Sequence, residues 1–428
     1  MPKISVYTLG CKLNFAETAT ILRDFLNHGY EQVPFGEPAD VVIVNTCTVT
    51  TQADNKSKFA VKKALKTSPQ AKVIVIGCSA QVSTQKYEHL PNVAMVVGAD
   101  KKLDVYQLLH SKKISKIAKP DDVFAIKEFK PAYSLHLRTR SFLKIQDGCD
   151  YVCSYCIIPK ARGRSRNAPI KELVKQAEKI AQNGIKEIIL TGVNIGDFGK
   201  STGESFLDLI KALDKIDNIK RIRISSIEPE LLKDEIIEFI ANSDKFMPHL
   251  HIPLQSGSDK ILRLMQRRYN TRLFRERILK AYNTIADIFF GIDVIVGFPG
   301  ETEQDFKQTY ELLESLPIAY LHIFPYSDRP GTKASSLPNK VDTHTKHLRV
   351  HKLMELSKQK HKNFYKKYLN TYRKVLFERT IKEGLIYGFT DNYIRVALPY
   401  DKRLTNEIIK VFLEKYDEQR QVILAKLK

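Results

Sequence analysis

The sequence has no run of about 18 consecutive apolar residues, the length that a membrane-crossing helix requires. Its first residues, MPKISVYTLG, lead directly into a strand-like segment and lack the pattern of a secretory signal. We therefore expect a cytoplasmic protein with no membrane attachment. Thiols stay reduced in that compartment, so disulfides are not expected, and metal binding or catalysis is the favoured role for the six cysteines.

Acidic residues are few relative to basic ones. The chain of 428 residues has 48 Asp and Glu against 69 Lys and Arg, which gives a formal net charge of +21. Such an excess is typical of a protein that binds a polyanion, most simply nucleic acid. A lysine-rich surface that is merely solvated is the alternative interpretation. The length predicts two or three domains.

The first hundred residues alternate short apolar runs with helix-length segments. The apolar runs are SVYTL, VVIVN, KVIVIG and VAMVVG. Segments 14–27 and 51–66 separate the first three runs and have the length of helices. Buried strands that alternate with helices predict a doubly wound parallel sheet. We expect this N-terminal domain to span residues 1–120, including a short helix near its end.

A longer α/β series occupies residues 135–367. Its six strand candidates are SFLKI, EIILTG, RIRIS, HLHIPL, DVIVGF and LHIF. Helix-length segments separate most of them, which predicts a partial (β/α)6 barrel and not a complete eight-fold one. The last segment, residues 369–428, contains short strands joined by turns and predicts a small all-β barrel. The predicted fold class is therefore α/β with three domains.

Three cysteines form the C-x3-C-x2-C run CDYVCSYC, directly after the strand candidate SFLKI. Thiolates at Cys149, Cys153 and Cys156 can hold three irons of a 4Fe–4S cluster, which leaves the fourth iron open to a substrate. A zinc site would need a fourth Cys or His at regular spacing, and the sequence has none nearby. The run lies at the end of a barrel strand, where barrel active sites are built.

The other three cysteines are scattered but share a position. Cys11 follows SVYTLG, Cys47 follows the VVIVN run and Cys78 follows KVIVIG. The C-terminal ends of parallel strands meet at one edge of a sheet, where ligands bind. We expect these cysteines to converge on a second three-cysteine site. Buried structural cysteines are the alternative.

These motifs resemble a known family. CDYVCSYC resembles the cluster motif of the radical S-adenosylmethionine superfamily, and TLGCKLN, VNTCTVT and GCSAQ resemble the N-terminal domain of the methylthiotransferases. The tail resembles the TRAM domain, a small RNA-binding β-barrel. CSYCIIPKARGRSR and SSIEP look most like the branch that acts on N6-threonylcarbamoyladenosine next to the anticodon. Other branches act on isopentenyladenosine in tRNA or on an aspartate of a ribosomal protein.

The resemblance implies an enzyme with two 4Fe–4S clusters and S-adenosylmethionine. The cluster on Cys149, Cys153 and Cys156 would bind and cleave the cofactor, and the resulting radical would abstract hydrogen from C2 of the adenine. The cluster on the other three cysteines would carry the methylated sulfur that is transferred. The implied partners are tRNA through its anticodon stem-loop, a reductant protein such as flavodoxin or ferredoxin, and a sulfur donor.

The resemblance and the barrel geometry also give candidate cofactor contacts. Tyr155 corresponds to an aromatic residue near the adenine of the cofactor. Gly192 and Asn194 match the segment that binds its amino group, although the usual glutamate of that segment is missing. Side chains at later strand ends point toward the barrel mouth. These later candidates are Ser226, Gln255 and Val296.

The remaining candidates concern RNA and substrate. Guanidinium groups suit phosphate or carboxylate recognition, and KARGRSR supplies Arg162, Arg164 and Arg166 after the cluster loop. Glu228 in SSIEP could read the threonylcarbamoyl group, but a carboxylate that starts a helix is the simpler interpretation. A non-catalytic iron–sulfur RNA-binding protein is the alternative from another class. The open cysteine spacing argues against it, because a structural cluster gains from a fourth ligand.

Three further groups of residues allow two interpretations each. Residues 344–367 form a basic helix that could contact phosphates, although charge runs are usually solvated. Phe389 and Tyr393 in the tail could stack on nucleotides, although aromatic residues in a small barrel are more often core. His249 and His251 alternate on one strand, but the histidines show no metal-ligand spacing.

Overall fold

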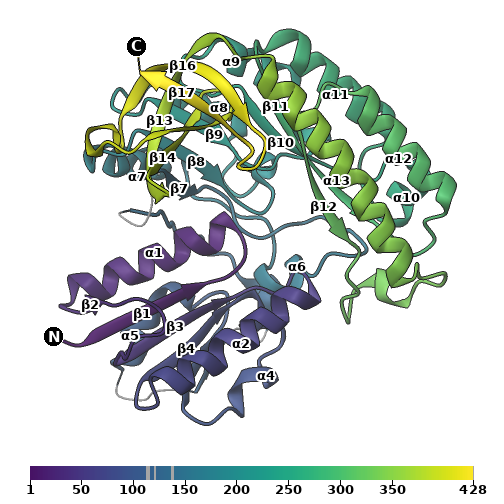
Figure 1. Ribbon diagram of the computed structural model, residues 1–428. Helices are drawn as coiled ribbons and strands as arrows, with labels where there is room; N and C mark the ends of the chain where they lie inside the picture. The colour runs from purple at the N-terminus through teal and green to yellow at the C-terminus, as the bar shows by residue number, and fades with distance from the viewer. Residues whose placement is uncertain (112–115, 120–121, 136–138, 428) are drawn as a thin grey trace.

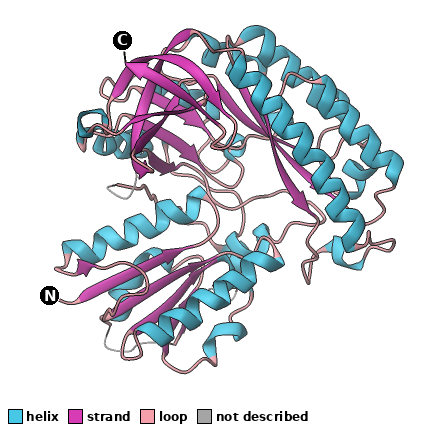
Figure 2. Cartoon of the chain, viewed as in Figure 1, coloured by secondary structure: helices cyan, strands magenta, loops and turns pink. Residues whose placement is uncertain are grey.

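The computed structural model describes residues 1–111, 116–119, 122–135 and 139–427. Three units follow one another along the chain (Figure 1): an N-terminal layered unit, a central curved sheet with helices along its outer side, and a small C-terminal β-barrel. Figure 2 shows that strands form the interior of the central unit and helices its outside. None of the helices in these residues has both the length and the apolar character that crossing a membrane requires.

The N-terminal unit is a fully parallel sheet in the order β2-β1-β3-β4-β5-β6. Its strands are β1 (Lys3–Thr8), β2 (Glu31–Gln32), β3 (Val41–Thr46), β4 (Lys72–Gly77), β5 (Val93–Val97) and β6 (Ile117–Ala118). Its helices are α1 (Lys12–Asn27), α2 (Thr51–Thr67), α3 (Cys78–Val82), α4 (Gln85–Glu88) and α5 (Val105–Leu109).

Helices cover both faces of this sheet. Ile43 belongs to an apolar cluster with α1 and α5, whereas its neighbour Val42 belongs to a cluster with α2, α3 and α4. This alternation follows from the two-residue period of a strand. The predicted doubly wound parallel sheet is therefore confirmed. The sequence did not indicate β2 and β6, because two residues are too few to show a periodic pattern.

The central unit contains six parallel strands in chain order. They are β7 (Ser141–Lys144), β8 (Glu187–Thr191), β9 (Arg221–Ile224), β10 (His249–Gln255), β11 (Phe289–Val296) and β12 (Tyr320–Pro325). They form two three-stranded sheets, and single bridges, such as Ile222 to Phe246 and Ser226 to His251, connect β9 to the β10 side. The predicted partial barrel of six βα units is confirmed by this arrangement.

Amphipathic helices pack on the outer side of the central strands (Figure 1). They are α7 (Ile170–Gln182), α8 (Phe206–Asp214), α9 (Asp234–Asn242), α10 (Asp259–Leu264), α11 (Thr271–Thr284), α12 (Glu303–Ser315) and α13 (Thr343–Lys366). The short helix α6 (Ile158–Arg162) lies apart from them, against α3 of the N-terminal unit. Local sequence sets their starts. Thr302 and Asp305, for example, form a reciprocal capping box at the start of α12, which pairs backbone N–H groups that the helix leaves free.

The C-terminal unit is a closed barrel in the order β13-β14-β15-β17-β16, as the sequence predicts for its tail. Its strands are β13 (Thr371–Lys382), β14 (Leu385–Thr390), β15 (Arg395–Pro399), β16 (Ile408–Asp417) and β17 (Val422–Leu427). Every pairing is antiparallel except that of β15 with β17. A core of mainly aliphatic side chains fills the barrel and extends to Phe289 of the central unit.

The turn after β14 packs the C-terminal barrel against the N-terminal ends of the central strands. Arg221 and Arg223 of β9 donate to four backbone carbonyls of this barrel at 2.7–3.0 Å. Tyr393 lies 4.2 Å from the ring of His249 and stacks on Phe389 at 4.7 Å between centroids. The structure therefore uses Phe389 and Tyr393 for packing between the two units, which agrees with the structural one of the two interpretations.

The basic helix α13 also makes contacts within the molecule. Arg349 is buried and donates to Glu301 at 2.6 Å, and the Lys360 ammonium donates to two carbonyls at the end of α12. Lys362 pairs with Glu418 of the C-terminal unit. These cations hold neighbouring elements together, so contacts within the protein explain several of the basic side chains of α13.

Candidate active site

Cys149, Cys153 and Cys156 lie on one loop between β7 and α6, and all three are half-buried free thiols. The loop turns tightly, with the Cys156 N–H donating to the Cys153 carbonyl at 3.1 Å. The Cys149 sulfur accepts the N–H of Tyr151 at 3.4 Å. Burial, together with the charges of the neighbouring thiolates, raises the pKa of Cys149 and of Cys156 to about 12.

Cys11, Cys47 and Cys78 meet at the carboxyl edge of the N-terminal sheet. Cys11 precedes α1, Cys47 follows β3, and Cys78 begins α3 directly after β4. Burial raises the pKa of Cys47 to about 12, with Cys78 and then Cys11 contributing through the repulsion between close thiolates. Gly10 shows how closely the chain packs here: a Cβ at this residue would lie 3.0 Å from the Cys47 Cβ.

Both three-cysteine sets fit an iron–sulfur cluster. Each consists of three free thiols that lie close enough to raise one another's pKa. Metal coordination removes these thiol protons and neutralises the thiolates. N–H groups that donate to ligand sulfurs, as Tyr151 does to Cys149, are a regular feature of cluster sites.

Arg162 connects the two cysteine sets. It belongs to α6, shortly after Cys156, yet its guanidinium reaches α1 and donates to Asn14 at 2.6 Å and to both oxygens of Glu17 at 3.1 and 3.2 Å. It also lies against Cys78, whose pKa it lowers in opposition to burial. A side chain of the central unit thus forms part of the surroundings of the second cysteine set.

The predicted RNA contact of Arg162 is corrected by this burial. Arg162 is 1% exposed and Arg166 is 5% exposed, and Asp147 accepts a hydrogen bond from each. A guanidinium enclosed in this way presents no donor to a phosphate. Arg164 differs, since its side chain is 70% exposed. Its contact with RNA stays a prediction.

Arg267 is a functional candidate that the sequence did not indicate. Its guanidinium donates to the Cys153 sulfur at 3.0 Å and also forms an ion pair with Glu228. Burial raises the pKa of Glu228, and the Arg267 charge opposes that rise. Glu228 therefore lies beside the first cysteine set as the partner of Arg267. The motif MQRRYN carries no spacing that would identify such a contact.

Gln146 holds the loop that contains Gly192 and Asn194. Its side-chain oxygen accepts the N–H groups of Val193 and Asn194, both at 2.9 Å. A Cβ at Gly192 would lie 2.9 Å from that oxygen and 3.0 Å from the Gln146 backbone oxygen, so glycine allows the loop to approach Gln146 closely. The Asn194 amide is buried near the Tyr151 hydroxyl, and in the described part of the chain neither of its polar atoms has a well-formed hydrogen bond. An unsatisfied buried amide next to the cluster loop fits a site for a polar cofactor group.

A cavity of about 280 Å³ lies between the N-terminal and central units. Tyr155 and Gln255 line it from the central unit, and Val49 and Thr50, just after Cys47, line it from the N-terminal unit. Gln255 ends β10 with φ of +64°, an uncommon backbone conformation for a residue other than glycine. The cavity therefore touches the chain close to a cysteine of each set.

Ser226 and Val296 have different positions relative to this cavity. Ser226 is half-buried and bridges to His251. The Val296 side chain is fully buried in the main apolar core, whereas its neighbour Ile295 lines the cavity. The structure thus brings Tyr155 and Gln255 together, but it places the Val296 side chain away from them.

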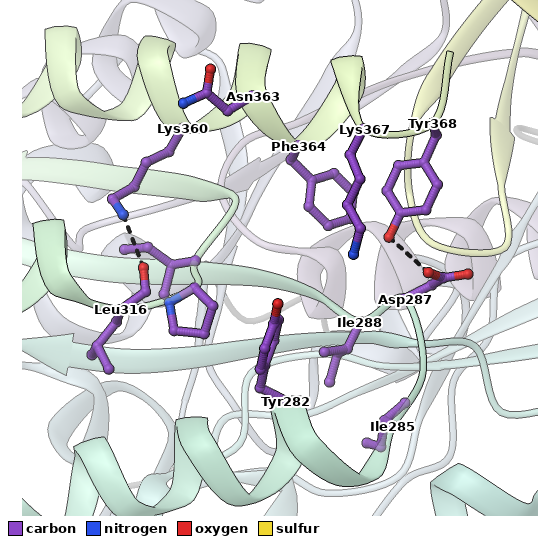
Figure 3. A pocket seen from close by; sticks show the side chains of 12 residues that line it. Tyr282, Ile285, Asp287, Ile288, Leu316, Lys360, Asn363, Phe364, Lys367 and Tyr368 are labelled. Atoms are coloured by element: carbon purple, nitrogen blue, oxygen red, sulfur yellow. Dashed lines mark hydrogen bonds between the residues drawn. The ribbon is translucent and has the colours of Figure 1, made fainter. Parts of the chain in front are cut away.

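A second cavity, of about 440 Å³, lies at the opposite ends of the strands (Figure 3). Residues that precede β11 and β12 form one side, and α13 forms the other. Its lining includes Asp287, which accepts the Tyr368 hydroxyl at 3.0 Å, and Lys360, which donates to the Leu316 carbonyl at 2.9 Å. Apart from residues of the basic helix α13, no candidate residue of the sequence analysis lines it, so it lies outside the candidate active site.

Comparison with known families matches two parts of the chain. Residues 143–313 match the radical SAM superfamily, and residues 3–98 match the uncharacterized protein family UPF0004. The first match contains Cys149, Cys153 and Cys156, and the second contains the other three cysteines.

Among solved structures, the chain is similar to the radical S-adenosylmethionine methyltransferase TsrM from Kitasatospora setae. The TM-score is 0.58 at 13% identity, over 78% of this chain and 75% of that one. At this identity the likeness concerns the fold alone.

Curated relatives match nearly the whole chain. The threonylcarbamoyladenosine tRNA methylthiotransferase MtaB of Bacillus subtilis is 38% identical over 96% of this chain and 93% of its own length. MtaB of Aquifex aeolicus is 38% identical over 92% of this chain and 96% of its own length. The tRNA-2-methylthio-N(6)-dimethylallyladenosine synthase of Methylacidiphilum infernorum is 32% identical over 96% and 92%. With its two cysteine sets and this match along its length, the chain belongs to the radical S-adenosylmethionine methylthiotransferase family.

Proposed function

We propose that this protein transfers a methylthio group to C2 of N6-threonylcarbamoyladenosine next to the anticodon of tRNA. The observation that carries the proposal is the cavity whose walls adjoin both cysteine sets, through Thr50 on one side and Tyr155 on the other. A reaction that generates a radical at one cluster and takes sulfur from another needs such a shared space. The identity to MtaB relatives supports the choice of nucleoside.

The thiols of each set would hold one 4Fe–4S cluster. When bound, the clusters and S-adenosylmethionine supply one-electron cleavage of a carbon–sulfur bond, abstraction of a hydrogen atom and a methylated sulfur. The protein positions these groups and excludes water from them. Gln146 fixes the loop at residues 192–194, and Arg267 orients the Cys153 sulfur and Glu228.

The cavity walls suit a purine. Phe324 and Val49 are exposed apolar side chains at the cavity, at 46% and 52% exposure, and Ile295 adds a further apolar surface. A base that leaves its stack in RNA binds to such surfaces. Apolar walls also exclude solvent and so limit side reactions of a reactive intermediate.

The proposed partners follow from the reaction. The substrate is tRNA, bound through its anticodon stem-loop, and the exposed Arg164 beside the cluster loop is a phosphate contact. The reduction step needs an electron donor such as flavodoxin or ferredoxin, and each methylthio transfer needs a sulfur donor. A cytoplasmic location accords with a tRNA substrate.

The test is mass spectrometry of tRNA nucleosides. Reconstituted, reduced protein is incubated anaerobically with S-adenosylmethionine and tRNA that bears N6-threonylcarbamoyladenosine. We expect that nucleoside to gain one methylthio group. A gain on isopentenyladenosine alone would overturn the proposed substrate. Cleavage of S-adenosylmethionine with no change in either nucleoside would indicate a protein substrate, and no cleavage at all would indicate a non-catalytic RNA-binding protein.

A further inference from the structure

His251, Asp293 and His322 form a polar cluster on the inner side of the central sheet. They come from the neighbouring parallel strands β10, β11 and β12, and Asp293 is paired in register with His322. The His251 Nε2 lies 2.6 Å from Asp293 Oδ1, and the two imidazole rings lie 4.8 Å apart. One potential ligand atom of each residue lies within 4.8 Å of the others.

The cluster opens toward the candidate active site. Asp293 lines the 280 Å³ cavity together with Gln255 and Tyr155. The side chains of His251 and Asp293 are 18% and 20% exposed, and His322 has more contact with solvent. Partial burial of the His322 ring lowers its pKa to about 4, and the charges of His251 and, to a smaller extent, Lys12 also lower it. Lys12 follows Cys11, so the cluster lies near the second cysteine set.

The hydrogen-bonding capacity of this cluster is only partly used. Among the described residues, His322 makes ring contacts with His251 and Tyr320 but no hydrogen bond. A neutral imidazole offers one donor and one acceptor, and the His251–Asp293 pair has further acceptor capacity at the carboxylate. Polar groups in a desolvated site bind a partner that satisfies them and reject one that leaves them unpaired.

We propose that His251, Asp293 and His322 bind the polar group on N6 of the substrate nucleoside and so select a threonylcarbamoyl group over an isopentenyl group. This inference rests on the proposed function. A threonylcarbamoyl group carries urea N–H groups, a hydroxyl and a carboxylate, which match the donors and acceptors of the cluster. An isopentenyl group is a hydrocarbon and would leave His322 and the remaining acceptor capacity of Asp293 unpaired. Sites built to hydrogen-bond a substrate discriminate strongly against analogues that lack the partner.

The same residues also have the composition of a two-histidine, one-carboxylate metal site. Two features favour the nucleoside. The short contact between His251 and Asp293 already occupies one atom of each, and Lys12 places a positive charge close to His322. A divalent cation would have to displace the contact between His251 and Asp293, and it would be repelled by the charge of Lys12.

The experiment compares two anticodon stem-loops that differ only in the N6 group, threonylcarbamoyl or isopentenyl. Each is tested for kcat/KM and, without S-adenosylmethionine, for its Kd with the cluster-loaded protein. His322→Phe keeps a ring against His251 and removes both nitrogens. The control is His361→Phe, since His361 of α13 is a half-buried histidine that also contacts Tyr320 but lies outside the cluster.

For the threonylcarbamoyl stem-loop, we expect His322→Phe to lower kcat/KM and to raise Kd, each by about 10- to 100-fold. This is the loss typical of a hydrogen bond to a charged group. Binding and turnover of the isopentenyl stem-loop should not fall, because that group makes no hydrogen bond to His322. RNA-independent cleavage of S-adenosylmethionine should be retained, and the control should keep the selectivity of the unaltered protein. Equal losses for both stem-loops, or an unchanged ratio, would overturn the inference. Zinc or iron bound beyond the two clusters and lost in His322→Phe would overturn it in favour of a metal site.

The two proposals fail in different ways. If the unaltered protein does not act on the threonylcarbamoyl stem-loop at all, the proposed function is wrong. If the unaltered protein acts on it and prefers it, but His322→Phe retains the full preference, only the role of the cluster is wrong. Asp293→Asn provides a second variant, because it keeps the shape of the side chain while removing the charge opposite His251.

Discussion

At the residue scale, Gly10 controls the approach of two cysteine-bearing loops. Its φ is +96°, and a Cβ there would lie 3.0 Å from the Cys47 Cβ and 3.1 Å from its sulfur. Contacts of that length force a neighbouring atom to move. The geometry of the second cysteine set therefore depends on the absence of a side chain at this position.

We expect Gly10→Ala to lose the second cluster while it retains the first. Iron content after reconstitution should fall by about half, because each 4Fe–4S cluster holds the same number of irons. Gly29→Ala is the matched control, since Gly29 also has a positive φ, of +84°, but a Cβ there would meet no atom within 4 Å. A full iron content in Gly10→Ala would contradict this account.

Glu17 lies at the centre of a group of buried charged side chains between the N-terminal and central units. Its carboxylate is fully buried among Arg162, Lys102 and Lys144. Burial alone would raise the pKa of Glu17, but these cations, led by Arg162, lower it to about 2. A depressed pKa means that the folded state holds its proton less tightly than the unfolded state, so the resulting stability is present above the ordinary pKa and is lost as pH falls toward 2.

The metal-free protein should therefore lose stability as the pH falls from about 5 to about 2. The Glu17 contribution to this loss is about 3 kcal/mol in unfolding free energy. Urea unfolding at a series of pH values measures it. Glu17→Gln should be less stable near neutral pH and should show a shallower dependence below pH 5. An identical pH dependence in the two proteins would show that Glu17 does not carry the effect.

At the element scale, β9 joins the central unit to the C-terminal barrel. Arg223 donates to two carbonyls of the turn after β14, at 2.7 and 2.8 Å, and its Nε donates to Glu187 at 2.9 Å. Backbone carbonyls that accept from a buried guanidinium are costly to leave unpaired. The position of the C-terminal barrel therefore depends on these contacts.

We expect Arg223→Met to increase hydrogen exchange in β14 and β15, because the docked turn loses its donors. Exchange in β1, β3 and β4 should stay the same, since these strands lie in the N-terminal unit. Arg420→Met serves as the control: Arg420 pairs with Asp417 and Glu383 on the surface of the same barrel. Equal exchange in the two variants would mean that the β9 contacts do not hold the barrel.

The sequence predicted elements better than contacts. The apolar runs of β3 and β4 are buried on both faces of the sheet and are visible as runs in the sequence, whereas two-residue strands are not. Arg162 was assigned to RNA because a basic loop gives no sign of the acids that enclose it. Glu17 lies 145 positions away in the chain, and only folding brings the two together. Arg267 was missed for the same reason.

At the scale of the whole molecule, the arrangement of the units builds the site. The sequence placed each cysteine set at the end of its own strands, but nothing in it states that the two ends face a common cavity. That arrangement comes from contacts such as Arg162 with Asn14 and from Arg329, which donates to Thr48 at 2.6 Å and Asp54 at 2.7 Å. Ion pairs between distant segments leave no local pattern to read.

The central claim is a division of labour between the cysteine sets, and Cys11→Ala tests it most directly. Cys11 is exposed, so its replacement should not disturb the fold. The measurement follows two products from the same anaerobic reaction with tRNA: 5′-deoxyadenosine and the methylthiolated nucleoside. We expect Cys11→Ala to form the first without the second, and Cys149→Ala to form neither. Methylthiolated nucleoside from Cys11→Ala would contradict the account.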